Sequence, residues 1–343
     1  MSGGVDSSVA AALLFEAGHD VVGVTMQLLP EGEAPGQCCG DDAVRSAKRV
    51  CDALGIPHYV MNSRDVFQRE VIDPFVAEYA RGRTPNPCIV CNDAVKFADL
   101  LARVSAQGAD ALATGHYARI VRDEDGTQWL ERGIDRDKDQ SYFLYRLGPP
   151  AIDRVLFPVG EMRKTEVREK AAALGLQTAE RADSQEICFV PPGATAAFVG
   201  AAEPRAIQPG ELVDASGTVL GMHRGIAHYT VGQRKGIGLA ATEPLYVTGI
   251  DPAANRVIVG ARRELERRSV RATDAVWRLD DDEARVEVQT RYRMEPVAGT
   301  AGHDGGIISI SLDAPVSGIA PGQAVVCYQG TRIVGGGVVS EAG

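Results

Sequence analysis

The sequence lacks any apolar run close to the roughly 20 residues that a membrane-spanning helix requires. Its N-terminus also lacks the basic start and continuous apolar segment of a signal peptide. We therefore expect a cytoplasmic protein. Hydrophobic residues make up 45% of the 343 positions and charged residues 24%, which is enough apolar material for two or three separate cores.

The chain also lacks an excess of positive charge, because 36 Lys and Arg stand against 46 Asp and Glu and the net charge is −10. This balance disfavours a protein that binds nucleic acid through overall attraction to phosphate. Any RNA contact must use local basic patches. Arg234, Lys235 and the five arginines within residues 262–271 provide such patches.

The cysteines do not form the even, closely spaced set of a small disulfide scaffold. The seven lie at positions 38, 39, 51, 88, 91, 188 and 327. In a cytosolic chain, this set indicates thiol chemistry or metal binding. The chain has one CxxC pair, Cys88 and Cys91, and lacks the second pair that a zinc ribbon needs. A buried apolar pair stays an alternative. Cys51 and Cys327 lie in apolar contexts that predict packing residues.

The pattern of apolar residues predicts three domains. Residues 1–190 alternate helical and strand patterns, which indicates an α/β fold with a parallel sheet covered by helices on both faces. Pro191, Pro192 and Gly193 break this pattern, and residues 191–262 predict a small β-rich middle domain. Residues 263–343 predict a C-terminal β-barrel. We expect helices at 9–17, 41–54, 65–81 and 95–107, and strands at 21–28, 58–62, 109–114, 212–220, 245–250 and 256–259.

A glycine- and hydroxyl-rich segment, Ser2–Ser8 (SGGVDSS), comes directly before the first predicted helix. Glycines let backbone N–H groups approach phosphate oxygens, and a helix N-terminus supplies partial positive charge. The lysine of the Walker motif is missing, so the segment is not an ordinary P-loop. A simple helix N-cap is the alternative explanation.

Two further segments carry cysteines. Thr84–Asn92 (TPNPCIVCN) contains prolines that restrict its backbone, which predicts a rigid, presented loop. Cys188 lies 97 residues after Cys91, in DSQEICF at 183–189, just before the predicted domain boundary. A cysteine on such a connection is placed to move.

Together these segments resemble a known family. SGGVDS resembles the PP-loop of the ATP pyrophosphatases, which cleave ATP to AMP and pyrophosphate. TPNP with its C-N pair, ATGHYAR at 113–119, KDQSYFLY at 138–145, DSQEICF, and YTVGQRKGIGL at 229–239 resemble the tRNA 2-thiouridylases, in that family's order and over nearly the whole chain. The resemblance implies a tRNA-uridine 2-sulfurtransferase that uses ATP and Mg²⁺ to replace the C2 oxygen of the wobble uridine with sulfur.

The resemblance also implies residue roles. It implies that Cys188 carries a persulfide whose sulfur comes from a cysteine desulfurase or a relay protein. It also implies that Cys91 is the second catalytic cysteine. The implied ATP site comprises Ser2, Gly3, Gly4, Val5, Asp6, Ser7, Met26 and Gly115, with Mg²⁺ near Asp6. The implied contacts to the target base are Asn86, Pro87 and Cys88. The implied tRNA contacts are His116, Lys138, Asp139, Gln140, Arg291, Tyr292 and Gln323.

The chain departs from the family pattern in two places. Family members carry Asp where this chain has Cys88, so Cys88, Cys91 and Cys188 together allow a [4Fe–4S] cluster as an alternative. The family's loop follows a first β-strand, whereas this chain begins at the loop. Two other functions stay open: another ATP pyrophosphatase, such as an amidotransferase synthetase, and an RNA-binding module without catalysis.

Overall fold

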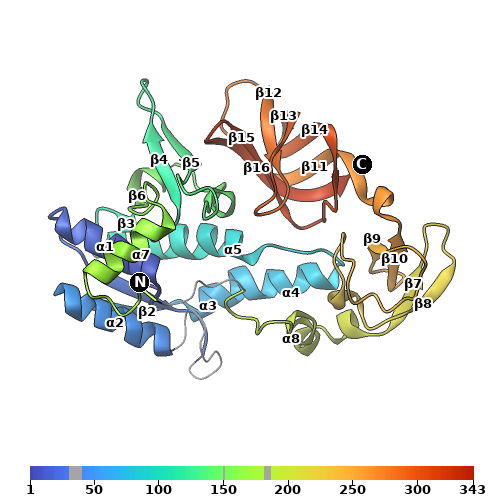
Figure 1. Ribbon diagram of the computed structural model, residues 1–343, viewed down its shortest axis with the longest axis horizontal. Coiled ribbons are helices and arrows are strands. Elements are labelled where there is room, and N and C mark those ends of the chain that lie inside the picture. Colours follow the sequence, from blue (N-terminus) through green and yellow to red (C-terminus); the bar gives the residue numbers. More distant parts are fainter. Residues whose placement is uncertain (31–40, 150, 181–186) are drawn as a thin grey trace. The chain divides into compact units, whose positions relative to one another are not determined.

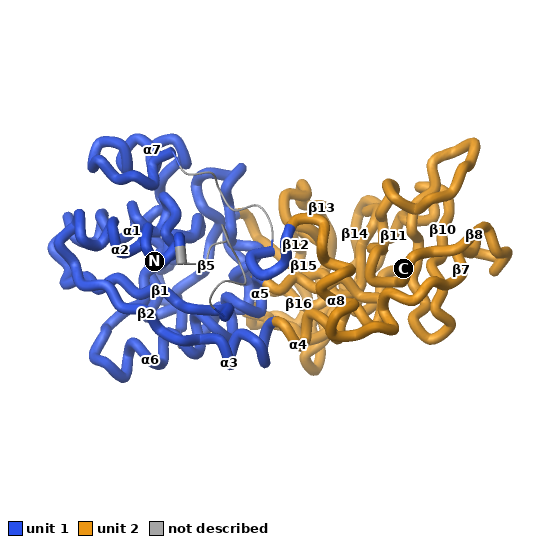
Figure 2. Tube along the Cα trace, turned by 90° about the horizontal axis from the view of Figure 1, so that it is seen from below, with its two compact units in different colours: residues 1–71, 88–191, 331–333 blue, residues 72–87, 192–330, 334–343 orange. Residues whose placement is uncertain are grey.

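The computed structural model describes residues 1–30, 41–149, 151–180 and 187–343 (Figure 1). Cys38, Cys39 and most of the DSQEICF segment therefore lie outside the described residues. The chain divides into two compact units, coloured separately in Figure 2. Unit 1 comprises residues 1–71, 88–191 and 331–333, and unit 2 comprises residues 72–87, 192–330 and 334–343.

Unit 1 begins with the predicted α/β alternation. The first elements are α1 (Val5–Glu16), β1 (Gly23–Gln27), α2 (Asp41–Leu54) and β2 (His58–Asn62). β1 and β2 pair in parallel, with Gly23 opposite His58. The helix predicted at 41–54 and the strand predicted at 58–62 are confirmed. α1 buries Val5 and Val9 in a core that it shares with a later helix.

A second parallel pair comes later in the chain. β3 (Leu112–Ala113) pairs with β6 (Val155–Leu156), and the Thr114 N–H donates to the Leu156 carbonyl at 3.0 Å. The parallel strands described in unit 1 thus form two two-stranded sheets, and they confirm the predicted α/β class. The amino group of Met1 donates to the Val24 carbonyl, so the first residue runs beside β1.

A helical stretch includes two π-helical segments. It comprises α3 (Arg64–Phe67), η1 (Gln68–Ile72) and α4 (Asp73–Ala80), followed by α5 (Pro87–Val90), η2 (Cys91–Leu100) and α6 (Leu101–Ala106). The CxxC segment is therefore helical, and the loop predicted for Thr84–Asn92 is wrong from Pro87 onward. Proline is tolerated at a first helical position, because the N–H that it lacks has no partner within the helix there.

Residues 72–87 belong to unit 2, and their side chains and backbone pack against other residues of that unit. Phe75 on α4 packs edge-on against Phe198, with ring centroids 6.3 Å apart. Gly82 lies so close to Ile250 that a β-carbon there would be 2.7 Å from its Cγ2.

The remainder of unit 1 holds an antiparallel hairpin, β4 (Ala118–Arg122) with β5 (Gln128–Arg132). The short helices η3 (Ser141–Leu144) and η4 (Ile152–Arg154) follow, and then α7 (Lys164–Ala173). Val167 and Ala171 of α7 share the core of α1.

The first part of unit 2 is the predicted β-rich region. Its elements are α8 (Thr195–Ala202), η5 (Pro204–Ile207), β7 (Gly210–Val213), β8 (Val219–His223), η6 (Ile226–His228), β9 (Tyr246–Asp251) and β10 (Arg256–Gly260). The strand predicted at 212–220 is wrong, because this stretch is a hairpin of β7 and β8. Asp214 forms the turn by accepting hydrogen bonds from the backbone of Ser216 and Thr218.

The second part of unit 2 is a barrel, which confirms the prediction. After η7 (Arg262–Leu265) come β11 (Glu266–Trp277), β12 (Glu283–Gln289), β13 (Val297–Asp304), β14 (Ile307–Ser317), β15 (Ala324–Gln329) and β16 (Arg332–Ala342). The six strands close through pairing of β11 with β16. Alternate residues of β14, namely Ile308, Ile310 and Leu312, fill the interior. Across the described residues, no helix is long and apolar enough to cross a bilayer.

Candidate functional site

The Ser2–Ser8 loop is folded around the N-terminus of α1. Gly4 is the N-cap residue, and its carbonyl accepts hydrogen bonds from the Ser8 hydroxyl at 2.8 Å and the Ser7 hydroxyl at 3.2 Å. The hydroxyls of Ser2 and Ser7 lie 3.1 Å apart. Gly3 has a φ of +70°, and a β-carbon there would lie 2.6 Å from the Ala43 carbonyl. The loop is thus a tight turn that only glycine permits at position 3.

Gly115 meets this loop from the end of β3, although more than 100 residues separate them in sequence. A β-carbon at Gly115 would lie 2.6 Å from both the Asp6 carbonyl carbon and the Ser7 nitrogen. The absence of a side chain therefore lets the two backbones touch. Met26, near the end of β1, is half-buried and packs with Met61, Leu100 and Val104.

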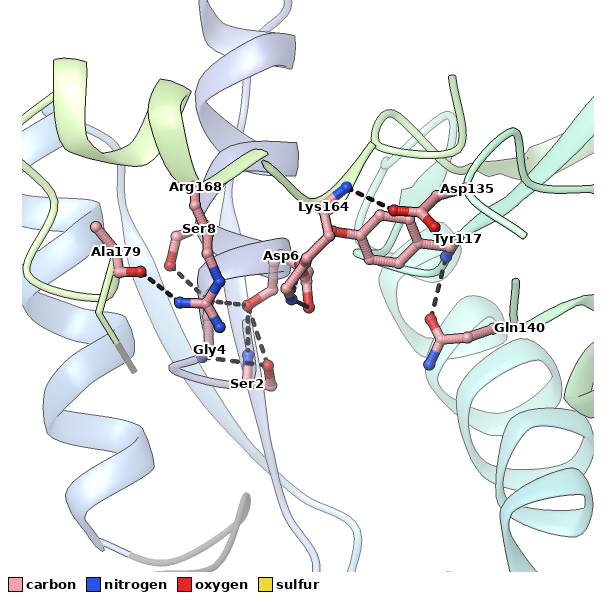
Figure 3. Close-up of polar contacts among 11 residues, drawn as sticks. Ser2, Gly4, Asp6, Ser8, Tyr117, Asp135, Gln140, Lys164, Arg168 and Ala179 are labelled. Carbon is pink, nitrogen blue, oxygen red and sulfur yellow. Dashed lines mark hydrogen bonds and ion pairs between the residues drawn. The ribbon is translucent and has the colours of Figure 1, made fainter. Parts of the chain in front are cut away.

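Asp6 lies in the first turn of α1 and has two partners that the sequence did not identify (Figure 3). The Lys164 ammonium lies 2.7 and 2.8 Å from its two carboxylate oxygens. The Tyr117 hydroxyl donates to the first of these oxygens at 2.6 Å. The single hint in the sequence was the missing Walker lysine, which leaves the loop without a cation of its own.

Cys91 begins the π-helix η2 and is buried, whereas Cys88 is exposed on α5 and Cys188 is partly exposed. Burial raises the pKa of the Cys91 thiol to about 12. The charge of Lys96 opposes this rise, while Cys188 and Cys88 lie near enough to add to it. In unit 1, Cys88 and Cys188 therefore lie close enough to Cys91 to affect its pKa. π-Helical segments often occur at functional sites.

The described side chains do not form a metal site. Within the described ranges, no group of three or more His, Cys, Asp or Glu side chains is arranged to hold a metal ion. This applies to Cys88, Cys91 and Cys188, so a cluster bound by these three would require them to move. Asn86 and Pro87 belong to unit 2, and Pro87 is the first residue of α5.

The raised pKa of Cys91 predicts slow alkylation. At pH 8, iodoacetamide should modify the exposed Cys88 faster than the buried Cys91, which should stay largely unmodified. A raised pKa keeps the thiol protonated below that pKa, so Cys91 labelling should keep rising toward pH 12. Peptide mass spectrometry over a pH series measures this, with buried Cys327 as the control. Equal rates for Cys88 and Cys91 at pH 8 would contradict the buried placement.

His116 follows β3 in an aromatic pocket of unit 1. Its ring centroid lies 6.0 Å from that of Phe97 and 5.9 Å from that of Phe157. Its Nδ1 atom is 2.7 Å from the Thr114 hydroxyl. Burial, and then the charge of Lys96, lower the pKa of His116 well below its usual range. The imidazole is therefore neutral at physiological pH and offers a hydrogen bond, not a charge.

The KDQ segment is tied to the nucleotide loop through Tyr117. The Gln140 side chain accepts a hydrogen bond from the Tyr117 N–H at 3.1 Å, and the Gln140 N–H donates to the Tyr117 carbonyl at 2.8 Å. Lys138 is partly exposed. Asp139 is buried, and it pairs with Arg132 at 3.0 Å and accepts from the Ser141 N–H at 3.1 Å. The Asp139 carboxylate therefore serves the fold of unit 1.

The remaining predicted contacts lie in unit 2. Arg291 is exposed in the turn after β12, and the Arg293 guanidinium lies 5.3 Å from the centre of the Tyr292 ring. Gln323 donates through its amide to the Thr84 carbonyl at 2.7 Å. Gln323 thus holds the backbone that leads into the CxxC helix.

Comparisons with known proteins cover the whole chain. Residues 1–192 match the family described as tRNA methyl transferase HUP domain, residues 198–261 its PRC-barrel domain, and residues 267–339 the aminomethyltransferase beta-barrel domain. The tRNA-specific 2-thiouridylase MnmA of Moorella thermoacetica is 50% identical, over 99% of this chain and 98% of its own length. The same-named protein of Chloroflexus aurantiacus is 48% identical, over 99% and 97%.

Solved structures also match, and one of them shows a much lower level of similarity. The U34-tRNA thiolase NcsA from Methanococcus maripaludis with its [4Fe-4S] cluster aligns over 60% of this chain and 62% of its own, at 20% identity and a TM-score of 0.35. That likeness is too low to establish a shared fold.

Proposed function

Because the chain belongs to the tRNA-specific 2-thiouridylase family, we propose that it uses ATP to replace the C2 oxygen of the wobble uridine of tRNA with sulfur. The single observation that carries this proposal is that relatives named for this activity align with nearly its whole length. Unit 1 supports this proposal, because it contains both the glycine- and hydroxyl-rich loop Ser2–Ser8 and the three cysteines Cys88, Cys91 and Cys188.

ATP makes the uracil oxygen a good leaving group. The C2 oxygen attacks the α-phosphorus of ATP, a new P–O bond forms, and pyrophosphate departs. The ATP site comprises the loop residues, Met26 and Gly115, and Asp6 offers a carboxylate to the Mg²⁺ that accompanies ATP. The N–H groups at the start of α1 and the hydroxyls of Ser2 and Ser7 stabilise the departing charge.

Sulfur then comes from a persulfide on Cys188, loaded by an external persulfide donor. Its terminal sulfur attacks C2 and AMP leaves, so that uracil is joined to Cys188 through two sulfurs. The Cys91 thiolate attacks the Cys188 sulfur, the S–S bond breaks, and 2-thiouridine is released. A Cys91–Cys188 disulfide remains, which an external thiol must reduce. In the alternative order, Cys91 first liberates hydrosulfide, which attacks C2.

The raised pKa of Cys91 has a consequence for this step. A buried thiol with a pKa of about 12 is a poor nucleophile at neutral pH. The charge of Lys96 lowers this pKa and therefore favours the reactive thiolate of Cys91. We infer that substrate binding changes the surroundings of Cys91 before it reacts.

A [4Fe–4S] cluster is the second candidate for sulfur delivery, favoured by Cys88 at a position where family members carry Asp. Cys88, Cys91 and Cys188 would bind three irons and leave the fourth for sulfide. Anaerobically purified protein with a broad absorption at roughly 400 nm would support the cluster, and colourless active protein would exclude it.

The tRNA contacts proposed on unit 1 are Lys138, Gln140 and His116, with Asp139 as a buried support. Arg291 and Tyr292 are proposed contacts on unit 2. Gln323 is a further proposed tRNA contact on unit 2, and Asn86, Pro87 and Cys88 are the proposed contacts to the target base.

ATP turnover tests the proposed function and separates it from the alternatives. With Mg²⁺ and a persulfide donor, the protein should form AMP and pyrophosphate when given tRNA with uridine at the wobble position. The same tRNA with cytidine there is the matched control and should give only background. Equal AMP formation with both tRNAs would favour another ATP pyrophosphatase, and no AMP with either would favour a non-catalytic RNA-binding module.

A further inference from the structure

The nucleotide loop contains no lysine or arginine between Ser2 and Ser8. A triphosphate carries several negative charges, whereas backbone N–H groups, hydroxyls and a helix N-terminus supply only partial positive charge. A Walker loop meets this need with a lysine inside its own motif. In this chain, a cation must come from another part of the fold.

Lys164 is placed to supply that cation. It is the first residue of α7, and its backbone N–H donates to the Asp135 carboxylate at 2.8 Å (Figure 3). α7 packs against α1 through Val167 and Ala171, which share a core with Val5 of α1. This packing brings the Lys164 ammonium to within 2.7 Å of Asp6, across 158 residues of sequence.

The surroundings of Lys164 hold its ammonium at the loop. The side chain is only 10% exposed, and a lysine this deeply buried requires a charge partner. Asp6 provides that partner through both oxygens. The ammonium also lies 5.5 Å from the centre of the Tyr117 ring, whose hydroxyl donates to the same carboxylate. One carboxylate therefore receives both groups.

We propose that Lys164 is a phosphate-binding residue of the ATP site, and that Asp6 holds it in place until ATP arrives. When Mg²⁺ and ATP bind, the Asp6 carboxylate turns to the metal ion, and the Lys164 ammonium turns to the phosphates that leave as pyrophosphate. No covalent bond changes in this exchange, because each charged group only replaces one opposite charge with another. The inference rests on the proposed use of ATP.

The competing explanation is that the pair simply ties α7 to α1. Lys170 offers a matched control for that explanation, because it also lies on α7 and pairs with Glu16 of α1 at 2.7 Å. Lys170 lies six residues after Lys164 on the helix, and its partner Glu16 is the last residue of α1. Removing Lys170 breaks a more exposed ion pair between the same two helices without touching the loop.

The experiment measures binding of ATP, pyrophosphate and AMP, each with Mg²⁺, by titration calorimetry. K164M should weaken ATP and pyrophosphate binding about tenfold or more, and should change AMP binding by less than about twofold. K164R should recover part of the loss because it keeps the charge, and K170M should match the wild type. A K164M protein that binds pyrophosphate as tightly as the wild type, or that loses AMP and pyrophosphate equally, overturns the inference.

Asp6→Asn gives a second test in the opposite direction. Without Mg²⁺, this variant should bind pyrophosphate at least as tightly as the wild type, because no carboxylate competes for Lys164. Weaker Mg²⁺-independent binding by D6N would contradict the exchange, and this test stands even if K164M does not fold. Failure of the wild-type protein to bind either ATP or pyrophosphate would refute the proposed function itself, which separates the two failures.

Discussion

Replacing Cys188 or Cys91 with serine is expected to reduce 2-thiouridine formation below detection, while tRNA binding stays close to that of the wild type. Serine cannot carry a persulfide at position 188, and at position 91 it cannot form the disulfide that releases the product. The measurement is the 2-thiouridine content of tRNA after incubation with each variant, together with its tRNA affinity. Retained thiolation by either variant would remove that cysteine from the mechanism.

Two other cysteines complete this experiment. Cys327 is a buried thiol in the barrel of unit 2, so Cys327→Ala controls for general loss of a thiol and should keep activity.

Cys88 distinguishes the two sulfur carriers. Under the persulfide route, Cys88→Ser and Cys88→Asp should both retain activity, whereas a cluster held by three cysteines would be lost with either. Inactive C88D protein would therefore contradict the persulfide route as proposed.

Replacing Gly115 with alanine is expected to lower ATP affinity at least about tenfold. The added β-carbon would lie 2.6 Å from two backbone atoms of Asp6 and Ser7, and backbone cannot move aside as a flexible side chain can. The loop would have to shift, and with it the N–H groups that bind phosphate. Titration calorimetry with ATP and a thermal melt measure the effect.

Gly302→Ala is the matched control for Gly115→Ala. A β-carbon at Gly302 meets nothing closer than the Asp282 carbonyl at 3.8 Å, which is an ordinary contact. This variant should bind ATP like the wild type. If G115A also binds ATP normally, Gly115 does not support the nucleotide site.

Sequence patterns predicted the elements whose signals are local. The helix at 41–54 and the strands of the barrel have apolar periods that match their final form, and the strand at 58–62 is a short apolar run. The apolar pattern gave the wrong element where a single side chain sets the local backbone conformation. Asp214 turns a predicted strand into a hairpin, and Pro87 begins a helix where two prolines suggested a loop.

The candidate site was predictable only in part, for a physical reason. The loop, Gly115 and the cysteines belong to recognisable segments, and the fold brings Gly115 onto the loop and the cysteines into unit 1. The pairing of Lys164 with Asp6 depends on how α7 packs against α1, and no local pattern encodes such packing. The buried pair of Asp139 with Arg132 was missed for the same reason, because a charged residue in a KDQ string gives no sign of burial.

The most direct test of the account uses a persulfide donor labelled with heavy sulfur. The wild-type protein is incubated with this donor, ATP, Mg²⁺, a thiol reductant and unmodified tRNA, and the tRNA nucleosides are analysed by mass spectrometry. We expect heavy 2-thiouridine at the wobble position, one AMP per thiolated uridine, and no product when ATP is omitted. Absence of 2-thiouridine with ATP present, or its formation without ATP, would contradict it.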